Sequence, residues 1–127
     1  ADRVYVFGQV ARVGILRLKD APDLLAAVAL SGGTTSVAVL SDMKVIREYK
    51  ERVGKPIVLS ANYKRILYQG DMSQNIRLQS GDVVYVPRMV IGDINEFITN
   101  TTPLLNYLFF PASYRDSYML DQNKLRW

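Results

Sequence analysis

The sequence predicts an α+β protein, with a small mixed β-sheet curled around one helix and a further helix near the C-terminus. Three observations support this class. Apolar, β-branched segments alternate with turn residues over the first two thirds of the chain, one stretch between them has the spacing and ends of a short helix, and a second amphipathic stretch follows Pro87. A chain of 127 residues can hold one such domain with its core and one extra element.

The first two strands are predicted near the N-terminus. Residues 3–10 (RVYVFGQV) are apolar at both alternating positions, which predicts a central strand covered on both faces. Gly8 within this strand allows a bulge or the close approach of another backbone. After Gly14, residues 15–18 (ILRL) alternate apolar and polar side chains and predict the partner strand of a hairpin.

The first helix is predicted within residues 20–33 (DAPDLLAAVALSGG). Asp20 is the candidate N-cap, and Pro22 suits the first helical turn. Gly32 or Gly33 supplies the left-handed residue that ends the helix. The apolar residues expected on one face are Leu24, Leu25, Val28 and Ala29.

The remaining elements follow in a regular order. Residues 43–50 and 57–60 predict a second hairpin around a turn at Gly54. Residues 62–71 predict one or two helical turns that stop at Gly70, and residues 78–87 predict a turn and a closing strand ended by Pro87. The order strand, strand, helix, strand, strand, short helix, strand is typical of a β-grasp domain.

Four motifs point to a particular family. They are VYVFGQV at residues 4–10, LLAAVALSGG at 24–33, VIRE at 45–48, and GDMSQNIRLQSGDVVYVP at 70–87. Together they resemble the SLBB family, the soluble ligand-binding β-grasp domains, over about residues 3–87. Val13 stands where the family often has the proline of a Pro-Gly turn. The resemblance predicts an SLBB β-grasp domain at residues 1–88 and a C-terminal amphipathic helix with a polar tail at residues 89–127.

Composition excludes several kinds of chemistry. The chain has neither cysteine nor histidine, which excludes disulfides, thiolate metal sites and every catalytic arrangement that needs an imidazole. Asp71 and Asp82 could form an acid–base pair, but aspartates that follow a glycine in a turn usually bond to their own backbone. We therefore expect no catalytic residues, no metal, no cofactor and no enzymatic activity.

A ligand site is predicted around Arg47, Tyr68 and Asn75, which could rim a cleft for a saccharide or a small molecule. The competing interpretation for Arg47 is that it covers the edge of the sheet. The eight tyrosines equally fit a half-buried core or a subunit contact. The net charge of +4 is dispersed along the chain, which favours a solvated surface over a nucleic-acid site.

The segment after Pro87 predicts a helix for assembly or membrane contact, because its apolar residues recur at three- and four-residue spacing. Asp93 and Glu96 suit its N-terminus, and Pro103 predicts a kink or a break. A lone membrane span needs about 20 largely apolar residues, which the polar residues here prevent. The residues expected on the apolar face are Ile91, Ile94, Phe97, Ile98, Leu104, Leu105 and Leu108.

The resemblance also implies a function. SLBB domains recur in Wza-type outer-membrane polysaccharide export proteins, in which subunits form rings and a C-terminal helix from each contributes to a barrel. By this resemblance we expect a non-catalytic module of a capsule or exopolysaccharide export protein, and a piece of a longer chain. The expected partners are other copies of the chain, polysaccharide, inner-membrane export proteins and the outer membrane, with a periplasmic or outer-membrane location. The alternative is a soluble ligand-binding domain.

Overall fold

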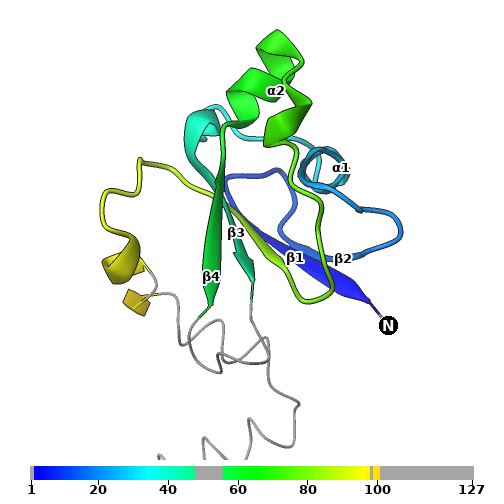
Figure 1. Cartoon of the computed structure of the whole chain (residues 1–127). Coiled ribbons are helices and arrows are strands. Elements are labelled where there is room, and N and C mark those ends of the chain that lie inside the picture. Colours follow the sequence, from blue (N-terminus) through cyan, green and yellow to red (C-terminus); the bar gives the residue numbers. More distant parts are fainter. Residues whose placement is uncertain (1, 48–55, 98, 101–127) are drawn as a thin grey trace, which may run out of the picture. The chain divides into compact units, whose positions relative to one another are not determined.

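A computed structural model describes residues 2–47, 56–97 and 99–100 of the chain (Figure 1). The chain separates into two compact units, Ala1–Gly92 and Asp93–Trp127. Within the described part of the first unit, a five-stranded mixed sheet in the order β2-β1-β5-β3-β4 is accompanied by two α-helices. This arrangement confirms the predicted α+β class and is consistent with a β-grasp fold.

The last strand of the domain lies at the centre of the sheet. It pairs in parallel with the first strand and antiparallel with the third, and each of these two pairs antiparallel with an edge strand. Each predicted strand is present, with bounds that differ by a few residues, while residues 48–50 of the third predicted strand and the predicted turn at Gly54 lie outside the described residues. The strands are β1 (Arg3–Gly8), β2 (Gly14–Arg17), β3 (Met43–Arg47), β4 (Ile57–Ala61) and β5 (Val83–Val86).

The hydrophobic core lies between one face of the sheet and the helices α1 (Leu24–Leu30) and α2 (Tyr63–Gln69). Burying each large aliphatic side chain here stabilises the fold by about 1.5–3 kcal/mol. In β1 the alternation places Val4 and Val6 in this core, whereas Tyr5 and Phe7 on the opposite face are only half-buried. The prediction that both faces of β1 are covered is therefore confirmed for the face toward the helices, whereas the opposite face is only partly covered.

The N-cap of α1 corrects the sequence prediction. Asp23, and not Asp20, caps the helix: its extended backbone precedes Leu24, and its carboxylate accepts a hydrogen bond from the Ala26 amide at 2.9 Å. Asp20 instead accepts a hydrogen bond from Arg17 Nε at 2.9 Å. The helix begins only at Leu24, so Asp20 lies too far upstream to reach its free amides.

The helix ends follow the prediction more closely. Gly32 and Gly33 have φ angles of 84° and 87°, and their amides bond to the last carbonyls of α1. Asn62 caps α2, and Gly70, with φ of 65°, ends it as predicted. Two short 3-10 helices, η1 (Leu40–Asp42) and η2 (Met72–Gln74), were not predicted, because one turn leaves no apolar period in the sequence.

The predicted close approach at Gly8 is confirmed. Gly8 pairs with Val86 across the parallel strands, and a Cβ atom built on Gly8 would lie 2.2 Å from the carbonyl oxygen of Val86. Its φ of 93° is also a conformation that L side chains rarely adopt. Only glycine therefore lets β1 and β5 meet at this point.

In the second unit, residues 94–97 and 99–100 are helical. Asp93 starts the helix, because its carboxylate accepts a hydrogen bond from the Glu96 amide at 3.1 Å, as its position in the sequence predicted. Ile91, which we had assigned to the helix face, lies before the cap and outside the helix. Ile98, Pro103, Leu104, Leu105 and Leu108 lie outside the described residues. Within the described part, no helix has both the length and the apolar character that crossing a bilayer requires.

We predict that Gly8→Ala lowers the free energy of unfolding by about 2–4 kcal/mol, because backbone strain is combined with a clash against Val86. Gly33→Ala is the matched control: its φ is nearly the same, but its added Cβ meets nothing within 4 Å. We expect it to cost about 1 kcal/mol from strain alone. Urea denaturation measures both; equal losses would show that the approach of Val86 is unimportant.

Candidate functional site

Arg47, the charged residue of the predicted ligand site, is paired within the domain. At the end of β3, its Nε donates to Asp82 Oδ1 at 2.9 Å and its Nη2 donates to Asp82 Oδ2 at 2.7 Å. The Asp82 side chain is 1% exposed and that of Arg47 is 16% exposed. Such a two-pronged guanidinium–carboxylate pair is among the stronger polar contacts in proteins. Arg47 therefore joins β3 to the residue immediately before β5.

The connector between η2 and β5, residues 75–79, is held from two sides. On one side, Arg47 Nη2 donates to the Arg77 carbonyl at 3.0 Å, and the Gln79 amide donates to Asp82 Oδ2 at 2.8 Å. On the other side, Asn75 Oδ1 accepts a hydrogen bond from the Leu25 amide at 2.9 Å, near the start of α1. Two of the predicted ligand residues, Arg47 and Asn75, thus secure the same connector.

Tyr68 occupies a different setting. It lies on α2 and is 72% exposed, so its ring is open to a partner or ligand. Leu67, which precedes it, and Met72, four residues later, are also exposed. Of the predicted ligand residues, Tyr68 is the one whose side chain is most accessible, whereas the polar groups of Arg47 and Asn75 already have partners in the domain.

The two glycine-following aspartates behave as structural residues. Asp71 Oδ1 accepts hydrogen bonds from the Ser73 hydroxyl and amide, and Arg65 Nη2 lies 2.8 Å from Asp71 Oδ2. The Ser73 hydroxyl in the first place, with the Ser73 amide and the charge of Arg65, holds the pKa of Asp71 below its usual value. Asp82 is committed to Arg47, so the pair has no arrangement suited to acid–base catalysis.

One titratable group in the core is also affected by its surroundings. Burial raises the pKa of the Tyr63 hydroxyl above its ordinary value, which keeps this core residue neutral. Across residues 2–47, 56–97 and 99–100, acidic side chains do not gather in any group of three that could hold a metal ion.

Comparison with known families gives one clear match: a family profile described as the SLBB domain matches residues 2–86. The chain belongs to the SLBB domain family. SLBB domains are non-catalytic binding modules, so a binding role fits the arrangement of this domain. The match ends at Val86, the last residue of β5, and so covers the whole sheet and both α-helices.

Two polar features of this SLBB domain were not found from sequence. The partnership of Arg47 with Asp82 joins two motifs that are 35 residues apart, VIRE and GDVV. A second missed feature is Lys44, a buried lysine within β3 that bonds to Asp42 and Ser60. In the sequence, a lysine between Met43 and Val45 is typical of a strand residue whose side chain points to solvent. Whether it is buried depends on which segments cover that face of the sheet.

We predict that Asp82→Ala lowers the free energy of unfolding by about 3–5 kcal/mol, because it breaks a buried ion pair and removes a carboxylate that accepts two hydrogen bonds from Arg47 and one from the Gln79 amide. The control is Asp20→Ala, which removes the carboxylate of the exposed Arg17–Asp20 pair and should cost at most about 1 kcal/mol. Urea denaturation of both variants gives the comparison. Similar small losses in the two would mean that the Arg47–Asp82 pair contributes little to the fold.

Proposed function

We propose that this chain is the non-catalytic SLBB module of a capsule or exopolysaccharide export protein, where it helps to build the ring of subunits and the export conduit. The observation that carries the proposal is the order of its parts. A domain of the SLBB family closes at β5, and a helix capped by Asp93 begins shortly after it. The same order of SLBB domain and C-terminal helix is what the resemblance to Wza-type export proteins implies.

In this proposal the two parts have different roles. The sheet and its helices form a rigid scaffold, because their core is closed and the connector before β5 is pinned by Arg47 and Asn75. The C-terminal helix provides contacts with neighbouring subunits or with the outer membrane, through Ile94, Phe97 and the apolar residues that follow. The partners would be other copies of the chain, polysaccharide and inner-membrane export proteins, in the periplasm or at the outer membrane.

We expect the full chain to form concentration-dependent oligomers, and a chain ending at Gly92 to remain monomeric, because the truncation removes the assembly helix but keeps the compact first unit. Sedimentation velocity over a hundredfold concentration range measures this. A full-length control, Ile94→Asn with Phe97→Asn, removes two apolar side chains without shortening the chain and should weaken assembly. A full chain that stays monomeric at all concentrations would contradict the proposal.

The second candidate is a soluble ligand-binding domain, which membership of the SLBB family favours directly. In this candidate function the exposed ring of Tyr68 supplies a stacking surface for a saccharide. In this candidate function Arg47 and Asn75 do not contact the ligand; they hold the connector at residues 75–79 in place.

For this candidate we predict that a bound oligosaccharide raises the melting temperature, since a ligand at 100 times its Kd stabilises the folded state by about 2.7 kcal/mol. Differential scanning fluorimetry with neutral and acidic oligosaccharides is the measurement. Tyr68→Ala should abolish the shift without lowering the melting temperature of the free protein, because the side chain is exposed. Leu30→Ala, another exposed apolar position, is the control and should keep the shift.

A further inference from the structure

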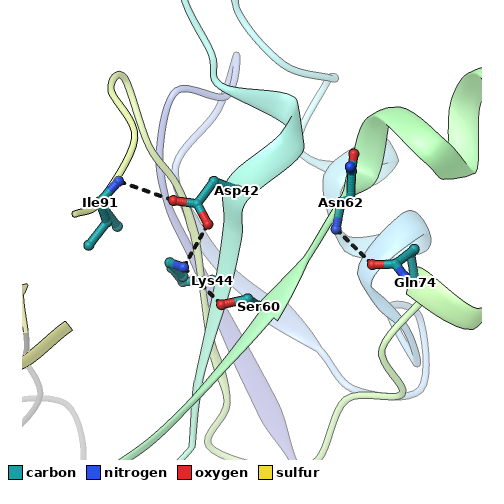
Figure 2. A network of polar contacts seen from close by, with 6 residues as sticks. All are labelled: Asp42, Lys44, Ser60, Asn62, Gln74 and Ile91. Atoms are coloured by element: carbon teal, nitrogen blue, oxygen red, sulfur yellow. Dashed lines mark hydrogen bonds and ion pairs between the residues drawn. The ribbon is translucent and has the colours of Figure 1, made fainter. Parts of the chain in front are cut away.

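Lys44 is a buried charge that the proposed function does not use. It lies in β3 and is 3% exposed. Its Nζ donates to Asp42 Oδ1 at 2.7 Å and to the Ser60 hydroxyl at 2.8 Å, the latter on the directly paired position of β4 (Figure 2). Burying an ammonium group is costly unless it is paired and hydrogen-bonded. Asp42 therefore provides the compensating charge that lets the lysine occupy this position.

Asp42 has a second partner on the far side of its carboxylate. Its Oδ2 accepts a hydrogen bond from the backbone amide of Ile91 at 3.1 Å (Figure 2). One carboxylate at the end of η1 thus links the buried lysine of β3 to the chain that leaves the domain after β5. Of these three groups, only the amide of Ile91 belongs to the segment beyond the SLBB family match.

A backbone contact anchors the same segment a few residues earlier. The Val39 amide donates to the Pro87 carbonyl at 2.8 Å. Between these two anchors, Met89 is 75% exposed and Val90 is 69% exposed, so their side chains contribute little burial. Pro87 itself is fully buried, so packing and the Val39 hydrogen bond together hold the start of this segment. Beyond the two exposed side chains, the hydrogen bond from Ile91 to Asp42 ties the chain to the domain again.

We propose that Asp42 and Lys44 form a clasp that fixes the chain leaving the SLBB domain as far as Ile91. Lys44 binds Oδ1 of the Asp42 carboxylate and so orients it, and Oδ2 of the same carboxylate accepts the hydrogen bond from the Ile91 amide. The clasp extends the ordered contacts of the domain past the end of the family match, as far as Ile91. This inference does not depend on polysaccharide export, because it concerns a contact within the first unit.

The test uses the full-length chain and amide hydrogen exchange measured by NMR. In the double variant Asp42→Ala with Lys44→Met, exchange at Ile91 should rise about tenfold, as expected for loss of a hydrogen bond to a charged group. Exchange at Val84, at the centre of the sheet, should stay slow and report an intact domain. Both charges are removed together because Asp42→Ala alone would leave the buried lysine unpaired. Slow exchange at Ile91 in the folded double variant would overturn the proposal.

A second variant removes the Ile91 amide donor and leaves the buried Asp42–Lys44 pair unchanged. Ile91→Pro removes the amide hydrogen that Asp42 accepts. The readout is the rate of tryptic cleavage after Arg88, an exposed residue between the two anchors. We expect cleavage to be several times faster in Ile91→Pro than in Ile91→Ala, which keeps the amide and serves as the matched control. Equal cleavage rates in the two variants would overturn the clasp even if the double variant failed to fold.

Discussion

The buried pair of Arg47 and Asp82 is the contact on which the arrangement of this domain most depends. Asp82 lies between the connector and the central strand β5: its side chain bonds to Arg47 at the end of β3, and its carbonyl accepts a hydrogen bond from Tyr5 in β1. Three strands thus meet at one residue. Because the Asp82 side chain is removed from water, losing Arg47 would leave a buried carboxylate without its guanidinium where the sheet is assembled.

Polar and apolar contacts have different roles in this fold. The apolar core between the sheet and its two helices gives stability, while the polar contacts position segments that have little apolar surface to bury. Arg47 and Asn75 hold the connector before β5, and Asp42 holds the chain after it. Both ends of the central strand are therefore fixed by side-chain hydrogen bonds, which suits a rigid scaffold for a binding or assembly module.

The fold was predicted well where local chemistry decides it. The sequence predicted a special backbone conformation at three glycines, and the structure has positive φ angles at Gly8, Gly32 and Gly70. Gly8 also makes the predicted close approach to a neighbouring strand. Residues other than glycine adopt such positive φ angles only at a cost in free energy. The N-cap of α1 was wrongly placed at Asp20, because two aspartates precede the helix and only the backbone path shows which one reaches its amides. The short 3-10 helices were missed because a single turn has no period to detect.

The site was harder to predict, for a physical reason. Arg47 and Asn75 were identified as polar residues of functional type, but the sequence could not show that Asp82 and the start of α1 would occupy their hydrogen-bonding groups. Lys44 had no distinguishing signal at all. Exposure alone separates Tyr68 from these residues, and exposure is a property of the assembled chain.

The sequence by itself determined the α+β class, the order of elements and the absence of cysteine and histidine chemistry, because these follow from periodicity, turn residues and composition. Its four motifs carried the resemblance to the SLBB family. Only the tertiary structure decided which charges are paired: Arg47 with Asp82, and Lys44 with Asp42 and through it with Ile91. These partners lie up to 49 residues apart in the chain. Their pairing depends on how the strands meet in space, which no local pattern records.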